Sequence, residues 1–306
     1  MTIIEGVTLL NHDDQPDPLS AAFDRVVEAI AEAVRAYRVS SRRPVAPITR
    51  ERLPFSIYFV LRNVTEPYEW GHSLFMTHLN PPGAIPYEVF TPEQLEQFQR
   101  YVELGRRGHP LFPFVERALD AERVLMISGD TANAVILAQV SIEIFLDTVL
   151  ELLLLDEGAD AVTAISILDE PLLRKVRRYF PERLGGDWNS NSGLIGEWRE
   201  RANALRGRVV HAGYTPSREE AWGAIRACHE LESFVRDQIA QKATRYPRAA
   251  LVVLGQPGLE SRAAWGRRMA GLADDLGDPL EAHAAWMSQL ERARSDRDEE
   301  KPPVST

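Results

Sequence analysis

The spacing of apolar and polar positions predicts mixed α and β structure over the first third of the chain. Alternating apolar residues indicate a half-buried strand over 53–61, a weaker second strand over 72–79, and a further strand over 3–10. Apolar residues recur every three or four positions over 19–37, which is the pattern of an amphipathic helix. A second helix is predicted over 91–105, where a Thr-Pro-Glu sequence has the composition of a helix start.

After Pro110 the periodicity becomes helical almost throughout. Helices with an apolar stripe or a capping residue are predicted over 113–127, 132–155, 161–168, 171–180, 193–210 and 218–239. The last of these opens with a capping box, Ser217 to Glu220. Beyond Pro247, residues 249–254 predict a short strand that returns to the amino-terminal sheet, and two helices follow over 265–276 and 280–290.

These patterns predict a mainly α fold with three structured parts. Residues 1–110 form an α/β module of unassigned role, residues 111–245 a helical bundle, and residues 246–293 the short strand and two helices. Residues 294–306 are charged and contain proline, so they are predicted to be a disordered tail.

Composition and cysteine content narrow the class of protein. The chain has 306 residues, a formal charge of −10 and a single cysteine, Cys228, which excludes disulfide frameworks and thiolate zinc sites within one chain. We therefore expect a cytoplasmic protein, and residues 1–10 show no secretory pattern. The most apolar segment, 132–155, carries Gln139, Glu143, Asp147 and Glu151, so it predicts a buried bundle helix and no membrane span.

Positive charge is concentrated in one part of this acidic chain. Residues 172–211 contain nine bases and four acids. Such a stretch predicts either local contact with a polyanion or a solvated helix face, and the charges alone favour neither.

Standard catalytic signatures are missing: the chain has no P-loop, no G-x-G-x-x-G, no H-E-x-x-H and no G-x-S-x-G. His72 and His78 are too far apart on a strand to share one metal, so neither a metal site nor a cofactor is predicted. What remains is the segment Arg206-Gly207-Arg208-Val209-Val210-His211, at the end of a predicted helix in the most basic stretch. An arginine five residues before a histidine means little alone, and its position makes it informative.

This arrangement resembles the HEPN superfamily, whose helical bundles carry an R-x(4–6)-H motif at the end of a core helix. Residues 204–213 look like that segment, residues 138–146 resemble the family's second helix with its A-x(4)-E-x-x-L run, and the helix from Glu219 looks like the closing helix. The resemblance covers residues 111–245, less than half of the chain. It implies that Glu143 is the acidic residue facing the motif.

The resemblance implies a metal-independent endoribonuclease that works as a two-fold homodimer, in a toxin–antitoxin or phage-defence setting with an antitoxin or other defence partner protein. Arg206 would hold the scissile phosphate of RNA and His211 would move a proton, because guanidinium forks bind phosphate and histidine titrates near neutral pH. Use of the 2′-hydroxyl would make the activity specific for RNA. Arg199, Asn203, Arg208 and Glu143 would support the site.

Two features keep other interpretations open. On an ideal helix Arg206 and His211 are about 140° apart, so they meet only if the helix ends between them or a second subunit completes the site. The family commonly has a polar residue after the arginine, and this chain has Gly207. Arg206 could then pair with Glu143, and His211 could cap the helix. The alternative function is a non-catalytic HEPN scaffold for dimerisation or partner binding; a small-nucleotide binder is less favoured without a phosphate loop.

Overall fold

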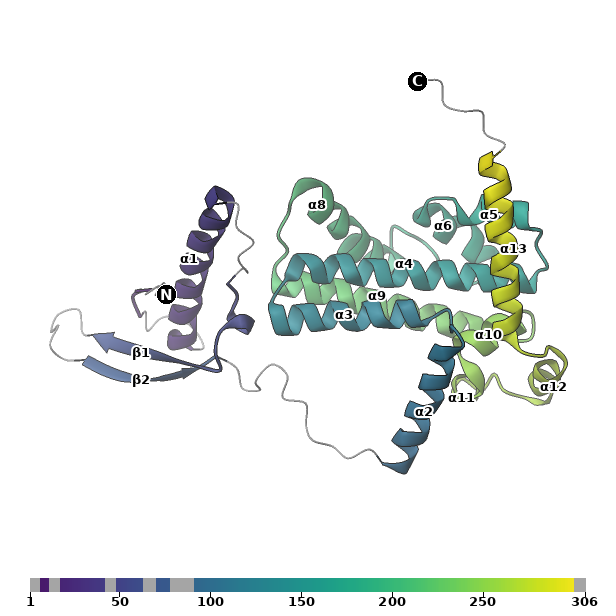
Figure 1. Cartoon of the computed structure of the whole chain (residues 1–306), viewed down its shortest axis with the longest axis horizontal. Helices are drawn as coiled ribbons and strands as arrows, with labels where there is room; N and C mark the ends of the chain where they lie inside the picture. Colours follow the sequence, from purple (N-terminus) through teal and green to yellow (C-terminus); the bar gives the residue numbers. More distant parts are fainter. Residues whose placement is uncertain (1–5, 11–16, 42–47, 63–69, 78–90, 300–306) are drawn as a thin grey trace, which may run out of the picture. The chain divides into compact units, whose positions relative to one another are not determined.

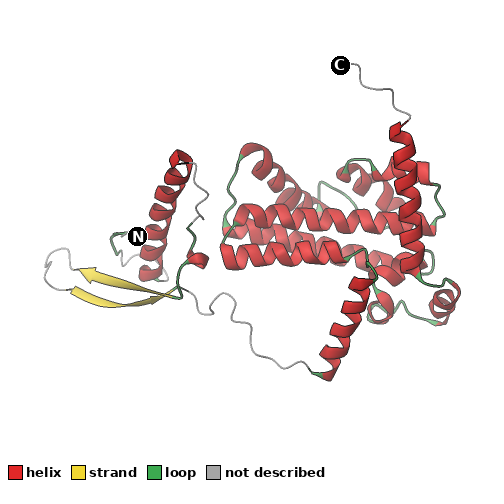
Figure 2. Ribbon diagram, in the orientation of Figure 1, coloured by secondary structure: helices red, strands yellow, loops and turns green. Residues whose placement is uncertain are grey.

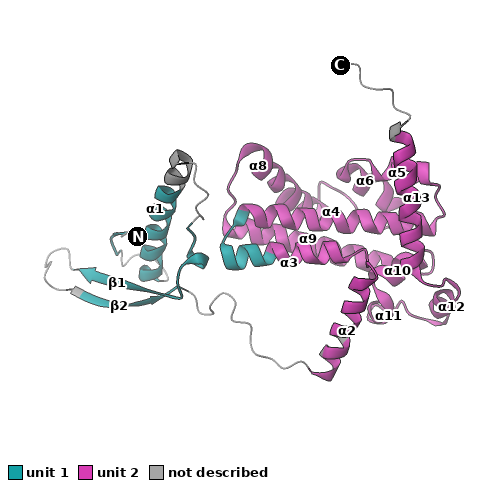
Figure 3. Cartoon of the chain, viewed as in Figure 1, with its two compact units in different colours: residues 1–88, 122–131 teal, residues 89–121, 132–306 magenta. Residues whose placement is uncertain are grey.

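The computed structural model of the chain describes residues 6–10, 17–41, 48–62, 70–77 and 91–299. The described fold is mainly helical, with one two-stranded antiparallel hairpin near its start (Figures 1 and 2). The helices are α1 Pro18–Ser41, α2 Pro92–Arg106, α3 Phe112–Ser128, α4 Thr131–Asp156, α5 Ala161–Leu168, α6 Leu172–Leu184, α7 Gly193–Trp198, α8 Leu205–Ala212, α9 Arg218–Gln241, α10 Pro247–Val253, α11 Gly255–Glu260, α12 Arg267–Asp275 and α13 Pro279–Glu299. The chain divides into two compact units, which Figure 3 shows in different colours.

The first unit joins α1 to the hairpin. Strand β1, Ser56–Arg62, pairs antiparallel with β2, Trp70–Met76, which confirms the two alternating segments as strands. The ring of Phe23 on α1 stacks on Phe75 of β2, with the centroids 4.4 Å apart. The strand predicted over 3–10 is wrong for residues 6–10, which have no regular secondary structure, and residues 3–5 lie outside the described part.

The second unit has α4 at its centre. Fourteen of its residues are buried, among them Val135, Ile142, Phe145 and Leu153. The ring of Phe114 on α3 lies 4.9 Å from that of Phe145, and the guanidinium of Arg236 on α9 lies 5.6 Å from the same ring. Apolar residues cover both sides of α4, which accounts for its nearly continuous apolar sequence. None of the described helices is both long enough and apolar enough to cross a membrane.

Residues 249–254 do not form the predicted strand, because Pro247–Val253 is helix α10. Pro247 occupies the first turn, where its missing N–H has no cost. The carboxylate of Asp156, at the end of α4, accepts hydrogen bonds from the backbone N–H of Arg248 at 3.2 Å and of Ala249 at 2.9 Å. A carboxylate at that position satisfies the free donors of a helix start, and it comes from 92 residues earlier in the chain.

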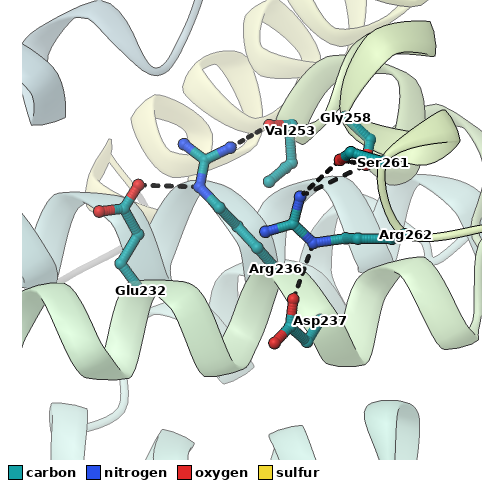
Figure 4. Close-up of polar contacts among 7 residues, drawn as sticks. All are labelled: Glu232, Arg236, Asp237, Val253, Gly258, Ser261 and Arg262. Carbon is teal, nitrogen blue, oxygen red and sulfur yellow. Dashed lines mark hydrogen bonds and ion pairs between the residues drawn. The ribbon is translucent and has the colours of Figure 1, made fainter.

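Two arginines attach α9 to the helices that follow it (Figure 4). Arg236 donates to Glu232 one turn away and to the backbone carbonyl of Val253 at the end of α10. Arg262, just after α11, donates to Asp237 of α9 at 2.7 Å. These bonds fix the start of the carboxy-terminal segment on the bundle.

The predicted disordered tail is wrong for residues 294–299, because α13 continues to Glu299. Arg294 and Arg297 reach back to Asp169, at the end of α5, with N···O distances of 3.3 and 2.7 Å. The charged residues 294–299 have no apolar face to bury. The last turns of α13 are instead paired with Asp169, which lies far away in the sequence. Residues 300–306 lie outside the described part of the chain.

Candidate functional site

The candidate residues lie on one long helical segment that combines three pieces. It begins with α7, continues as π-helix over Arg199–Ala204, and ends with α8. Its buried residues follow each other every three or four positions: Ile195, Trp198, Ala202, Leu205 and Val209. Helix α7 and the π-helical part pack against α9. Apolar periodicity therefore sets which side of the segment is buried.

The π-helical turns lie directly before the motif. A π segment widens the helix locally and leaves backbone and side-chain groups imperfectly paired; such segments are frequent at functional sites. Here Trp198 is fully buried, and its indole Nε1 has no hydrogen-bond acceptor among the described residues. The Nε of Arg199 is likewise buried and without an acceptor in that part of the chain. Buried donors without an acceptor are uncommon in proteins, and this segment contains two of them within two residues.

Arg199, Asn203 and Arg206 line one flank of the segment. Each follows a buried residue directly and is itself half-buried, so the three side chains border the same buried stripe on successive turns. The Nε of Arg206, like that of Arg199, is buried without an acceptor in the described residues. No hydrogen bond or ring contact joins these three side chains to one another in the described residues.

Arg206 and His211 do not share a face within one chain. Helix α8 runs without interruption from Leu205 to Ala212 and ends at Gly213, whose φ of 64° is left-handed. The helix thus does not end between the two residues, and five residues of regular helix separate their directions by about 140°. Arg206 is half-buried, whereas His211 is exposed in the last turn. A site built from both residues needs a second subunit.

Glu143 does not pair with Arg206 in this chain. Its carboxylate accepts a 2.9 Å hydrogen bond from Nε2 of Gln139, one turn earlier on α4. It also lies close enough to Cys228 of α9 that its charge, after the larger effect of burial, raises the pKa of that thiol. Within the described residues no hydrogen bond or ion pair joins Glu143 to Arg206, so the interhelical pair considered from the sequence is wrong.

Arg208 makes a contact that sequence patterns did not predict. Its guanidinium carbon lies 3.7 Å from the centre of the Tyr214 ring. The Tyr214 hydroxyl donates to the carboxylate of Glu220, whose oxygens lie 2.9 and 3.0 Å away. Glu220 also accepts from the backbone N–H of Ser217 at 2.7 Å, as the predicted capping box requires. The capping box was recognisable in the sequence, and no motif pointed to Tyr214.

Most bases of the stretch 172–211 have partners within the chain. Ion pairs, a hydrogen bond or an aromatic ring hold Arg174, Lys175, Arg177, Arg178, Arg183, Arg201 and Arg208. Among the described residues of this stretch, Arg199 and Arg206 are the two whose guanidinium groups have no such partner. Four of the nine bases, Arg174, Lys175, Arg183 and Arg201, are therefore paired with a carboxylate, and the other five keep their charge without an acidic partner in the described residues.

No metal centre accompanies this site in the described residues, which contain no group of three or more ligating side chains. His72 lies exposed on β2, and His78 falls outside the described part. Comparisons of the chain with protein-family models, with curated proteins and with solved structures find no match.

Proposed function

We propose that this chain is a HEPN-type protein that binds RNA through Arg199 and Arg206 and cleaves it without a metal, with His211 moving the proton. The observation that carries the proposal is the contrast within the basic stretch. Four of its bases are ion-paired with acids and three others contact a serine hydroxyl or a tyrosine ring, whereas Arg199 and Arg206 have neither kind of partner in the described residues. Both side chains are only partly buried, and no acid of the chain occupies either guanidinium, so a phosphate group can bind the part of each that solvent reaches.

The reaction needs few groups. The 2′-oxygen of a ribose attacks the adjacent phosphorus and the bond to the 5′-oxygen breaks, which leaves a cyclic phosphate and a free 5′-hydroxyl. One proton leaves the 2′-hydroxyl and one reaches the 5′-oxygen, and an exposed histidine can transfer protons in both steps. An arginine against the phosphate stabilises the charge that develops there. Because Arg206 and His211 point apart on α8, the proposal includes a homodimer whose two α8 helices meet.

The test is cleavage of mixed single-stranded RNA in EDTA by the wild type, Arg206→Ala, His211→Ala and a control, Arg201→Ala. Arg201 lies on the same segment, is exposed and faces Glu197 at 3.8 Å, so its removal lowers the charge without touching the flank. We expect a loss of about 100-fold or more in the first two variants and near-wild-type cleavage in the control. A wild type that does not cut, or equal cutting by all variants, excludes the nuclease.

A non-catalytic scaffold is the second candidate, and exposed apolar residues favour it. Helix α2 carries Leu95 at 45% exposure and Tyr101 at 52%, and α3 carries Leu119 at 61%. A contiguous patch of such residues is typical of a protein-binding surface, and the scaffold candidate requires these side chains to form one. Analytical ultracentrifugation combined with RNA titration separates the two candidates, because a scaffold stays dimeric and shows no affinity for RNA.

A further inference from the structure

The position of Arg208 suggests a role that the R-x(4–6)-H resemblance does not assign. Arg208 and His211 are three residues apart on a regular part of α8, so their directions differ by about 60° and their Cβ atoms lie roughly 5–6 Å apart. Both side chains are exposed. Arg206, by contrast, is half-buried and points away from His211. The cation that shares a face with the exposed histidine is therefore Arg208.

From this geometry we infer that Arg208, braced by Tyr214 and Glu220, is the phosphate-binding partner of His211 within one chain. The inference rests on the proposed RNA cleavage and changes its assignment: Arg208 contacts the scissile phosphate as a catalytic residue, and Tyr214 and Glu220 act as positioning residues. Arg206 then holds a neighbouring phosphate along the flank that it shares with Arg199.

The Tyr214 ring orients the Arg208 guanidinium and leaves its N–H groups free to bind an anion. A guanidinium stacked on an aromatic face keeps its N–H groups in its own plane, where an anion can reach them. The carboxylate of Glu220 accepts from the N–H of Ser217 and from the Tyr214 hydroxyl, and these bonds, followed by the charge of Arg208, lower its pKa. Among the described residues no acceptor forms a hydrogen bond or ion pair with Arg208, whose guanidinium lies over the ring of Tyr214 and near the charge of Glu220.

The same network fixes the backbone around His211. The carbonyl of Arg208 accepts from the N–H of Gly213 and, at 3.3 Å, from that of Tyr214, which closes the end of α8. Tyr214 is in turn bonded to Glu220 in the first turn of α9. His211 lies between these two anchored points. A functional side chain such as that of His211 is held in place only when its supporting residues are fixed. Here the supporting residues are Tyr214, which follows α8, and Glu220 of α9.

The experiment compares kcat and KM of RNA cleavage in EDTA for Arg208→Ala, Arg208→Lys, Tyr214→Phe and His211→Ala. Arg178→Ala is the matched control, since Arg178 is also exposed and also lies over a tyrosine ring, that of Tyr179, at 5.3 Å. We expect Arg208→Ala to lower kcat about 100-fold. Arg208→Lys should lower it about tenfold, because an ammonium group does not stack on an aromatic ring and cannot bind phosphate with two parallel donors. Tyr214→Phe keeps the ring and loses the hydroxyl, so kcat falls severalfold while KM stays constant.

Binding supplies a readout independent of cleavage. Affinity for a 2′-deoxy oligonucleotide, which cannot be cut by this chemistry, is measured over a range of salt concentrations. Loss of one phosphate contact reduces the slope of log affinity against log salt by about 0.7 for a single strand, and we expect this for Arg208→Ala and not for Arg178→Ala.

The outcomes separate the two proposals. If the wild type cleaves and His211→Ala does not, while Arg208→Ala matches Arg178→Ala in rate and in salt slope, the role of Arg208 is overturned and the nuclease stands. An equal fall in both kcat and KM for Tyr214→Phe would overturn its positioning role. If the wild type neither cleaves RNA nor binds the oligonucleotide, the proposed function is wrong, and the role of Arg208 is wrong as well.

Discussion

The ammonium nitrogen of Lys175 lies 2.5 Å from Oδ1 of Asp147, and the two partners are buried to very different degrees. The Lys175 side chain is 5% exposed, whereas that of Asp147 is 42% exposed. Lys175 also donates to the backbone carbonyl of Leu168 at 3.1 Å. The buried cation depends on its acid, while the acid can be solvated without the cation. This pair links α6 to α4 and removes one base from the charge available to an anionic ligand.

Removing the acid is therefore expected to cost more than removing the base. Asp147→Ala leaves a buried ammonium uncompensated and should lower the free energy of unfolding by about 3 kcal/mol. Lys175→Met leaves a hydrated carboxylate and an apolar side chain of similar length, so about 1 kcal/mol is expected. Urea unfolding followed by circular dichroism measures both. Equal losses, or a larger loss for Lys175→Met, would show that the pair is not buried as described.

Arg50 is expected to hold the first unit together. Its guanidinium donates to Asp24 of α1 at 2.8 Å and to the backbone carbonyl of Thr77 at 3.3 Å, and it lies 5.6 Å from the rings of both Phe23 and Phe75. Arg50→Met should destabilise the contact between α1 and the hairpin by about 1–3 kcal/mol.

Hydrogen exchange of the β2 amides measures the effect of Arg50→Met. Arg52→Met is the control, because Arg52 is an exposed residue of the same 3₁₀ turn, Arg50–Arg52. Amides of α9 serve as an internal reference. Protection of β2 that is unchanged in Arg50→Met, or equally reduced in Arg52→Met, contradicts the assignment.

Tyr246 is expected to make stability depend on alkaline pH. Burial, followed by the hydrogen bond to Glu157, raises the pKa of this phenol from 10.0 to about 12. Above pH 10 the unfolded chain loses the proton while the folded chain keeps it, so the contribution is complete below pH 10 and is lost as the pH rises to about 12. A shift of about two units corresponds to about 2–3 kcal/mol.

The comparison with Tyr246→Phe isolates this contribution. The variant lacks the 2.9 Å bond to Glu157 at every pH, and it has no phenol whose ionisation could change its stability. Between pH 10 and pH 12 the wild type should lose stability faster than the variant, so the gap between them closes. Parallel urea-denaturation curves across this range would mean that Tyr246 is accessible to solvent when folded.

Gly207→Asn tests the departure from the HEPN motif. A Cβ built on Gly207 has no atom within 4 Å, and its φ is not left-handed, so neither space nor backbone demands glycine. The substitution should leave stability within about 0.5 kcal/mol, since asparagine is no worse than glycine inside a helix. If the chain is a HEPN nuclease, RNA cleavage rises severalfold. Cleavage that stays the same or falls in a folded variant removes support for the resemblance.

Periodicity alone anticipated most helices, because their apolar residues repeat with the helical period. Helix α5 begins and ends where the sequence predicts, with Asp160 accepting from the N–H of Thr163 at 2.9 Å. The Ser217 capping box is also confirmed. In each case the deciding interaction lies within a few residues along the chain, which is why the local sequence reveals it.

The sequence predicted only part of the candidate site. The order of Arg206 and His211 along α8 is visible in the sequence, and so is the angle between them. The engagement of Glu143 by Gln139, the stacking of Arg208 on Tyr214 and the unpaired state of Arg199 are not. A charged side chain can reach several partners, and the helices that pack beside it decide which of them it contacts.

Taken by itself, the sequence determined where the two hairpin strands and most of the helices form, because both follow from the spacing of side chains within one element. Tertiary structure decided the rest. The apolar run 249–254 predicts a strand and forms helix α10 instead, and the Asp156 carboxylate, 92 residues earlier, accepts hydrogen bonds from the start of that helix. Lys175 likewise counts as a surface base in the sequence and becomes a buried partner of Asp147. Local periodicity carries no information on contacts between residues far apart in the chain, and those contacts select the partner of each charge.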